Sequence, residues 1–470
     1  MMIFSDRVDS TFHDLIYSKT GIFKKKQYQS ELMFSCHFRT SAPLPDPPIY
    51  FTSVLLTFLI SCLAILPPIM LSNAVGSHVK CISFKLSRVR FASEPDVATK
   101  ELVVTGSWME EVNRLCLWRY DCGELIDSGR LQAHSEAEYD LSAGVLGDSA
   151  DDPRLMDSLI HLGSVQDLKV HPSTQRIYSA SSSGSLQMFS TDTVDSIRLR
   201  RISAPGWIPF PQPALPGNLP VSLASLAVSA DGDQVYFADD LGRLASAHVS
   251  RIPSAVDSSD GDFDFVQSST PVDRSALVET GADVASVNAL ERVDNSCLVS
   301  ANQLGQLKVW DLRCGLQKPQ QRLLRPGETQ PLYCLGPHPG QPHLLAVGGV
   351  AGSVGSAAYI WDLRAEQYPL TEIACDGQSV WEVSFHRGQP RHLYLATETA
   401  GLLRISSSRD DNDSWTGFKG SRRKLTVADA LLSTATRVRH VISFDLSNTK
   451  LVCAHSDSTL QTVSCDSFAY

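Results

Sequence analysis

Two closely similar short segments constrain the fold of this chain most. Gly305 to Arg313 reads GQLKVWDLR, and Ala357 to Arg364 reads AAYIWDLR. In each segment apolar residues alternate along one strand length, and the segment ends in Trp-Asp-Leu-Arg. A period of two is typical of a β-strand with one buried face. The recurrence of the same ending indicates a repeated all-β unit.

The same unit recurs along the chain without its Trp-Asp ending, and no sustained helical periodicity interrupts the series. Seven units are recognised, in chain order: Val103 to Trp118, Val165 to Phe189, Leu223 to Val249, Val284 to Asp311, Leu332 to Asp362, Val380 to Ile405, and Val441 to Val463. The Trp-Asp ending is typical of WD-repeat blades, in which the Trp packs between blades. We therefore predict a seven-bladed WD-repeat β-propeller, with the blade signature at Trp118, Trp310, Asp311, Trp361 and Asp362.

The last unit supplies only three strands, whereas one extra strand is expected near the start of the series, from about Lys80 to Phe91. The simplest solution is that this N-terminal strand completes the seventh blade. Such closure joins the two ends of the ring and removes an exposed sheet edge.

The repeats place the propeller at residues 79–467 and leave 1–78 as a separate extension. Blade ends lie farther apart than usual, so some loops must be insertions. Three stand out, near 121–158, 191–220 and 251–279; the first and third are acidic and the second is rich in Pro. We expect these loops to be disordered or to bind partners.

The extension contains an apolar segment at 50–71 that carries no charge and is long enough to span a bilayer. One interpretation is a membrane anchor. The other is that the extension is not part of the working protein, because Met70 could serve as the start and the repeats begin only near Val79. Membrane contact is expected only if the segment is a genuine transmembrane helix.

Charge and cysteine usage exclude several classes of function. The formal net charge of −10 argues against direct nucleic-acid binding, which requires a basic surface. The basic run Lys419, Arg422, Arg423 and Lys424 is interpreted as a solvated loop. The 11 cysteines form no Cys-x-x-Cys pair and no zinc-ligand spacing, which favours a reducing compartment without metal or disulfide framework.

No catalytic motif is found, so we predict neither an enzyme nor a cofactor. The glycine-rich run from Gly348 to Gly355 leads into a strand rather than a helix, and is interpreted as a lengthened turn. His171, His338 and His386 occupy equivalent places in three units. Because catalysis would not be repeated three times, we interpret them as hydrogen-bonded turn residues.

Several stretches together resemble one family of propellers. They are GSW…LCLW from Gly106 to Trp118, NQLGQLKVWDLR from Asn302 to Arg313, VWEVSFH from Val380 to His386, and LVCAHSDSTLQTV from Leu451 to Val463. In colinear order they resemble the WD-repeat nucleoporin of the 43 kDa class, from the Y-shaped outer-ring complex of the nuclear pore. The resemblance covers about residues 79–467.

This resemblance implies a non-catalytic scaffold subunit in the nucleus, at the nuclear pore complex of the nuclear envelope. It implies docking on an α-solenoid nucleoporin, and support for pore assembly, nucleocytoplasmic protein transport and mRNA export. It brings no catalytic residue. Residues 1–70 have no counterpart in the family.

The two Trp-Asp-x-Arg endings support an alternative. In consecutive blades they resemble the box of substrate receptors of cullin-RING ubiquitin ligases, in which two arginines contact the ligase adaptor. Arg313 and Arg364 would be those contacts here. The simpler interpretation is that each Arg pairs with a neighbouring carboxylate or carbonyl at the blade edge.

Overall fold

The structure of the chain is a computed structural model. It describes residues 77–92, 101–120, 153–192, 197–204, 206–213, 220–254, 277–324, 329–352, 356–364, 368–375, 378–398, 400–407, 415, 423–426, 429–430, 440–447 and 450–464. Ala74–Tyr470 forms one unit, separate from Met1–Asn73. The predicted apolar segment 50–71 lies outside the described residues, among which no helix is long and apolar enough to cross a membrane.

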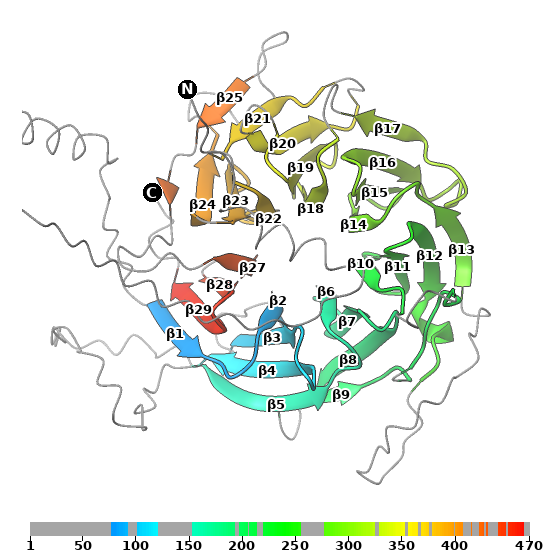
Figure 1. The fold of residues 1–470 in the computed structure, drawn as a ribbon, viewed down its shortest axis with the longest axis vertical. Coiled ribbons are helices and arrows are strands. Elements are labelled where there is room, and N and C mark those ends of the chain that lie inside the picture. The colour runs from blue at the N-terminus through cyan, green and yellow to red at the C-terminus, as the bar shows by residue number, and fades with distance from the viewer. Residues whose placement is uncertain are drawn as a thin grey trace, which may run out of the picture. The chain divides into compact units, whose positions relative to one another are not determined.

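The unit from Ala74 onward is a ring of seven antiparallel blades (Figure 1). Blade 1 contains β2 (Leu86–Phe91), β3 (Glu101–Ser107), β4 (Arg114–Tyr120) and β5 (Arg154–Ile160). Blade 2 contains β6 (Val165–His171), β7 (Arg176–Ser181), β8 (Leu186–Asp192) and β9 (Arg198–Arg201). Blade 3 contains β10 (Leu223–Val228), β11 (Gln234–Asp239), β12 (Arg243–His248) and β13 (Leu277–Ala282), with the short 3₁₀ turn η3 (Val249–Arg251) after β12.

The remaining blades follow in the same direction. Blade 4 contains β14 (Val287–Arg292), β15 (Cys297–Asn302), β16 (Gln306–Asp311) and β17 (Gln321–Leu324). Blade 5 contains β18 (Leu332–Pro337), β19 (Leu344–Gly349), β20 (Ser356–Asp362), β21 (Thr371–Ala374) and a fifth strand, β25 (Arg423–Thr426). Blade 6 contains β22 (Val380–Phe385), β23 (His392–Thr397), β24 (Gly401–Ser406) and β26 (Asp429–Ala430). Blade 7 contains β27 (Val441–Leu446), β28 (Lys450–His455), β29 (Thr459–Ser464) and β1 (Ser77–Cys81).

The N-terminal strand closes the ring, which confirms the predicted all-β seven-bladed propeller with its mixed last blade. β1 pairs antiparallel with β29 from Ser77 opposite Val463 to Cys81 opposite Thr459. The prediction of one strand from Lys80 to Phe91 was wrong, because the chain turns after Cys81 and this stretch contributes to two strands. The remainder of that stretch, β2, is the innermost strand of blade 1 rather than part of blade 7.

Apolar side chains from neighbouring blades share their cores. The junction between blades 7 and 1 joins Val452, Ala454 and Leu460 to Val89 and Trp118 in a single buried cluster. Every blade therefore buries both of its faces against neighbouring blades, because its strands carry apolar side chains on both faces. A blade on its own would leave both faces in water.

Part of the Pro-rich insertion at 191–220 belongs to the core. Strand β9 begins within it, and Trp207 and Phe210 beyond β9 are both buried. Both rings pack edge-on against Phe237 of blade 3, with centroid distances of 6.1 and 5.5 Å. Blade 3 has the small residue Ala247 at the place that Trp310 occupies in blade 4. The insertion therefore brings aromatic bulk to a blade that lacks a signature Trp, and disorder was the wrong expectation for this part.

Trp415, in the segment between β24 and β25, is also part of the core. Trp415 is buried against Phe385 of blade 6 with a centroid distance of 5.6 Å, and its indole N–H donates to the carbonyl of Pro390 at 3.0 Å. Beyond it, β25 pairs parallel to β21 and lengthens blade 5. Arg423 and Lys424 therefore lie in a strand rather than in the predicted loop. Lys419 and Arg422 lie outside the described residues.

The other two insertions are described only at their ends. β5 begins inside the range 121–158, and β13 begins inside 251–279, where the returning chain forms the outer strand of the blade. Residues 121–152 and 255–276 lie outside the described residues. Of the glycine-rich run, Gly348 and Gly349 end β19, and Ser356 begins β20 directly after the run.

Candidate functional site

The innermost strands of the seven blades share one irregularity. In each of β2, β6, β10, β14, β18, β22 and β27 the register shifts between the first and third residues, which makes the second residue a β-bulge. A bulge increases local twist and redirects side chains. These strands lie nearest the centre of the ring (Figure 1), so the bulges set the direction of the polar side chains there.

Side chains near these bulges connect each blade to the next. The seven links are Arg88 Nε to the Asp167 carboxylate (3.8 Å), Asp167 to the Leu226 N–H (2.9 Å), Ser225 to the Val287 carbonyl (3.3 Å), Asn288 to the Leu332 carbonyl (2.8 Å), Cys334 to the Val380 carbonyl (3.8 Å), Glu382 to the Phe444 N–H (2.9 Å) and Ser443 to the Val89 N–H (3.2 Å). Six are hydrogen bonds and one is an ion pair. Together they fix the angular position of every blade about the axis.

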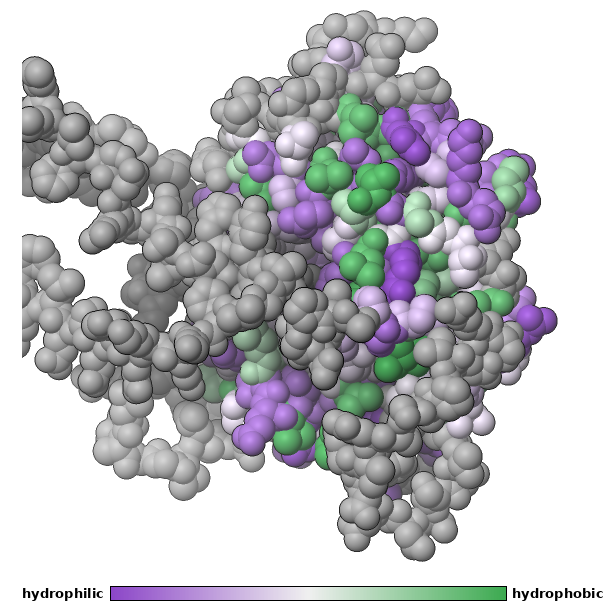
Figure 2. Space-filling model, turned by 45° about the vertical axis from the view of Figure 1, so that its right-hand side comes forward, coloured by the Kyte–Doolittle hydropathy of each residue, from purple (hydrophilic) through white to green (hydrophobic). Residues whose placement is uncertain are grey.

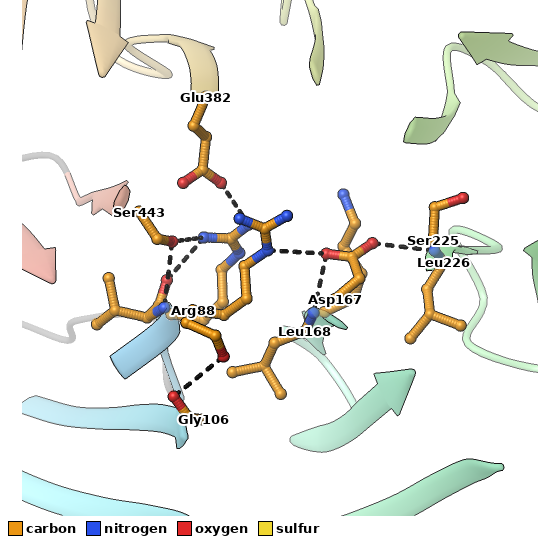
Figure 3. A network of polar contacts seen from close by, with 12 residues as sticks. Arg88, Gly106, Asp167, Leu168, Ser225, Leu226, Glu382 and Ser443 are labelled. Atoms are coloured by element: carbon orange, nitrogen blue, oxygen red, sulfur yellow. Dashed lines mark hydrogen bonds and ion pairs between the residues drawn. The ribbon is translucent and has the colours of Figure 1, made fainter. Parts of the chain in front are cut away.

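Charged side chains from several blades meet at the centre of the ring, where Figure 3 shows Arg88 beside Asp167 and Glu382 pointing toward the same place. Arg90 donates to the Glu382 carboxylate across the ring at 2.5 Å, and also to the Ser443 hydroxyl and the Phe444 carbonyl, both at 3.2 Å. Burial alone would lower the pKa of Arg90, but attraction to Glu382, Asp445 and Asp167 overcomes this effect and raises it. Arg90 thus links blades 1, 6 and 7 as a permanent cation.

A second set of charges links blade 2 to blades 1 and 4. The Lys169 ammonium pairs with the Glu291 carboxylate of blade 4. Burial would raise the pKa of Asp167, but attraction to Lys169, Arg88 and Arg90 holds it below its usual value. We call Arg88, Arg90, Asp167, Lys169, Glu291, Glu382 and Asp445 the central polar cluster. The central polar cluster was not predicted from the sequence, although charged residues within the otherwise apolar first strands of the blades could have indicated it.

The predicted signature tryptophans lie in the third strands of blades 1, 4 and 5, and all three are buried. The Trp310 indole N–H donates to the Ser300 hydroxyl at 3.0 Å, and that of Trp118 donates to the Thr105 hydroxyl at 2.8 Å. Each bond joins the second and third strands of one blade. Trp361 packs at the junction with blade 4, in the cluster that contains Val309.

The two Trp-Asp-x-Arg turns have the same geometry. Asp311 accepts from Arg313 through Nε at 2.9 Å, Nη2 at 2.7 Å and the backbone N–H at 3.0 Å. Asp362 and Arg364 repeat these three distances. The hydrogen bonds from Arg313 lower the pKa of Asp311 to about 2. The side chains of Arg313 and Arg364 remain 75% and 65% exposed, so each guanidinium is oriented by its own turn and open to solvent.

The repeated histidines hydrogen-bond within the turns that follow the first strands of blades 2, 5 and 6, as predicted, although His171 is itself the last residue of β6. His171 contacts the Thr174 hydroxyl at 2.9 Å through Nδ1, while His338 and His386 accept at Nδ1 from backbone N–H groups two and three residues on. His161 was not singled out from the sequence. Its Nε2 contacts the Ser179 hydroxyl and its Nδ1 the Gly163 carbonyl, both at 2.7 Å, and burial lowers its pKa to about 4.

A buried ion pair that was not predicted from the sequence lies between blades 3 and 4. Lys308 Nζ is 2.5 Å from the Asp283 carboxylate, and both side chains are almost completely inaccessible to solvent. The same carboxylate accepts from Asn302 at 2.9 Å and from the Ser300 hydroxyl at 3.4 Å. Ser300 in turn holds Trp310, so the pair is part of the blade signature. Its role is structural.

The links between blades and the buried ion pairs hold the blades in fixed positions, so the propeller presents a rigid surface. Within the described ranges, no three His, Cys, Asp or Glu side chains are grouped so that they could hold a metal ion. Hydrophobic and hydrophilic residues alternate over the side that Figure 2 presents. Ring closure, blade signature and central cluster together define a WD-type β-propeller.

Comparison with known proteins identifies the kind of propeller. No protein-family model matches the chain. It is 26% identical to nucleoporin Nup43 of Mus musculus over 358 residues, which cover 76% of this chain and 82% of the mouse protein. It is also 26% identical to human Nup43 over 377 residues, covering 79% and 86%, respectively. A nuclear pore complex protein nup43 of Dictyostelium discoideum is 23% identical over 192 residues, 37% of this chain and 43% of that protein. The chain is thus a distant homologue of the Nup43 class of nucleoporins.

Proposed function

We propose that this chain is a non-catalytic scaffold subunit of the nuclear pore complex, in the Y-shaped outer-ring assembly. The observation that carries the proposal is the homology to two Nup43 nucleoporins over more than four-fifths of their length. A match of 358 to 377 residues extends over many repeats rather than a single one. It supports a structural role at the nuclear pore, and a location in the nuclear envelope.

The geometry is consistent with such a role. All seven blade junctions are linked at the centre, and the ring is closed by its own first strand. A closed ring presents fixed loops and rims on which other subunits can dock, and partner binding then requires little ordering of the propeller. We infer that its partners are other nucleoporins, including an α-solenoid subunit, and that it supports pore assembly, protein transport and mRNA export.

Imaging tests the proposal. The full chain and a version that starts at Met70 are tagged at the C-terminus and expressed at endogenous level. Both should give a continuous nuclear-rim signal that coincides with another outer-ring nucleoporin. A diffuse signal from both would contradict the proposal. If only the full chain reached the rim, residues 1–69 would be needed for targeting.

A receptor role in a cullin-RING ubiquitin ligase remains a second prediction. Two exposed arginines, Arg313 and Arg364, are held in identical orientations on consecutive blades, which is the observation in its favour. Changing both to Ala should abolish co-purification of the ligase adaptor, while thermal unfolding stays close to that of the unchanged protein. Failure of the unchanged chain to bind the adaptor would eliminate this role.

A further inference from the structure

Blades 3 and 4 each present an exposed leucine in a turn of the same geometry. In the β11–β12 turn the Asp239 carboxylate accepts from the Leu241 N–H at 3.0 Å and from the N–H two residues further on at 2.8 Å. In the β15–β16 turn the Asn302 side-chain oxygen accepts from the Leu304 N–H at 3.0 Å and again two residues further on at 2.9 Å. A glycine at positive φ follows each leucine. Leu241 is 48% and Leu304 43% exposed, so each turn holds its leucine in solvent.

The turn itself does not require a leucine. The Asp or Asn side chain fixes the turn, and the glycine supplies the positive φ. Ser183 occupies the equivalent position in the β7–β8 turn of blade 2, and Asp457 occupies it in the β28–β29 turn of blade 7, each directly before a residue at positive φ. Both of these residues are polar. Leu241 and Leu304 therefore add apolar surface that the fold does not need.

The segment 283–286, between β13 and β14, joins the two leucine turns into one surface. The Leu241 turn packs against it, because a Cβ on Gly242 would lie 2.5 Å from a backbone oxygen of this segment. The Leu304 turn contacts the same segment through a backbone hydrogen bond of 3.0 Å. Within the segment, Val284 is 64% exposed, more than any other large apolar side chain that the structure describes. We call Leu241, Val284 and Leu304 the apolar turn surface.

An open hollow adjoins this surface on the side of blade 5. Gly305, directly after Leu304, lines it together with Leu332 of β18 and Val350, which follows β19. Most of the lining residues are apolar. The apolar turn surface therefore continues into a depression that suits an aliphatic side chain of a partner.

The free charge on this surface is negative. Asp240 is partly exposed and forms no ion pair with a residue that the structure describes. The carboxylates of Asp239 and Asp283 are buried and already paired, with Arg243 and Lys308 respectively. The whole chain has a net charge of −10, which is of the same sign. A partner that brings a cation is therefore favoured.

We propose that the apolar turn surface, with the adjoining hollow, is a docking site for an aliphatic segment of a partner protein that carries a lysine or arginine. Aliphatic side chains of the partner cover the three exposed residues and enter the hollow, and its cation pairs with Asp240. A second copy of the chain, docked through the same surface, would bring another carboxylate instead of a cation. The inference rests on exposure, contacts and charge in blades 3 to 5, and does not depend on the proposed place at the nuclear pore.

Fluorescence anisotropy with the purified full chain tests the proposal. The probe is a labelled synthetic peptide of leucines and lysines; one control peptide has Ser in place of each Leu, and another has Gln in place of each Lys. We expect saturable binding of the Leu–Lys peptide, at least about tenfold weaker binding of the Ser peptide and about threefold weaker binding of the Gln peptide. The Ser peptide measures general attraction to an acidic protein, because it keeps every lysine.

Two pairs of substitutions locate the site. Leu241→Ser with Leu304→Ser should weaken binding of the Leu–Lys peptide at least about tenfold, and the turns should form as before, because Ser183 occupies this turn position in blade 2. Leu155→Ser with Leu324→Ser is the matched control, since both are similarly exposed leucines on the outer strands of blades 1 and 4. The control pair should leave binding within about twofold. The absence of saturable binding, equally tight binding of the Ser peptide, or equal loss in the two pairs would overturn the proposal.

Further measurements identify the occupant. Asp240→Asn should weaken the Leu–Lys peptide about threefold and leave the Gln peptide unchanged; an equal effect on both peptides would eliminate the charge contact. Sedimentation velocity should show a monomer. A dimer that dissociates on Leu241→Ser with Leu304→Ser would show that a second copy occupies the surface, and the proposal would be wrong. It would also be wrong if only a version that starts at Met70 bound the peptide, because residues 1–69 would then cover the surface.

Discussion

At the scale of single residues, polar side chains determine how the blades are held together. Arg90 and Glu382 form a close link across the centre, and both side chains are about seven-eighths buried. Their positions in the sequence are 292 residues apart. A charged residue in an otherwise apolar strand can be noticed in a sequence, but its partner cannot be, because only ring closure brings the two together.

Removing one member of this pair should cost more than removing both. Arg90→Met leaves the Glu382 carboxylate buried without its cation, and should lower the free energy of unfolding by about 3 kcal/mol. The double change Arg90→Met with Glu382→Leu should recover part of that loss. Urea unfolding of both variants measures the effect, with the exposed Arg322→Met as control. Equal losses in the single and double variants would show that the pair does not act as a unit.

The buried His161 gives a defined response to acid. Its pKa in the folded protein is about 4, below the ordinary value of 6.5, so the unfolded chain binds a proton first as pH falls. Stability is therefore lost progressively below pH 6.5, and the loss is complete near pH 4.

Between pH 7 and pH 5 this effect should amount to about 2 kcal/mol. His161→Gln should remove that dependence, although it lowers stability at pH 7 through the changed contacts with Ser179 and Gly163. Thermal unfolding at pH 7, 6 and 5 measures the difference between the two proteins. Parallel pH profiles would contradict the assignment of a neutral, buried His161.

At the scale of elements, strand order followed from the repeats, whereas packing of the insertions did not. Alternating apolar residues and turn residues located the blade strands because each strand buries side chains locally. The composition of the Pro-rich insertion gave no indication that Trp207 fills space beside Ala245 and Ala247. Nor did the run from Lys80 to Phe91 show its turn, because it lacks Gly, Pro, Asn and Asp there. The burial of Trp207 and the turn after Cys81 both depend on contacts with residues that are distant in sequence.

Trp207→Ala should be severely destabilising for an insertion residue. It removes a buried ring that packs against Phe237, and the cavity should cost about 3 to 5 kcal/mol. Leu304→Ala, in an exposed turn, should cost less than about 0.5 kcal/mol. Denaturant unfolding compares the two. A small effect of Trp207→Ala would mean that the insertion lies on the ring without supporting it.

At the scale of the whole molecule, closure by β1 should control both stability and association. A version that starts at Leu86 loses β1 and leaves the β29 edge unpaired, whereas one that starts at Met70 retains β1. An open edge is a template for pairing between chains. We expect the shorter protein to melt at lower temperature and to associate with increasing concentration, as followed by light scattering. A monomeric shorter protein of unchanged melting temperature would contradict closure by β1.

The central claim is that this closed propeller is a structural subunit of the nuclear pore, and quantitative co-purification tests it most directly. The chain is tagged at its endogenous locus and purified under mild conditions, and the recovered proteins are quantified by mass spectrometry. The account predicts outer-ring nucleoporins in near-equal molar amounts to the tagged chain. Recovery of the chain without nucleoporins, or with a ubiquitin-ligase adaptor as the only stoichiometric partner, would contradict it.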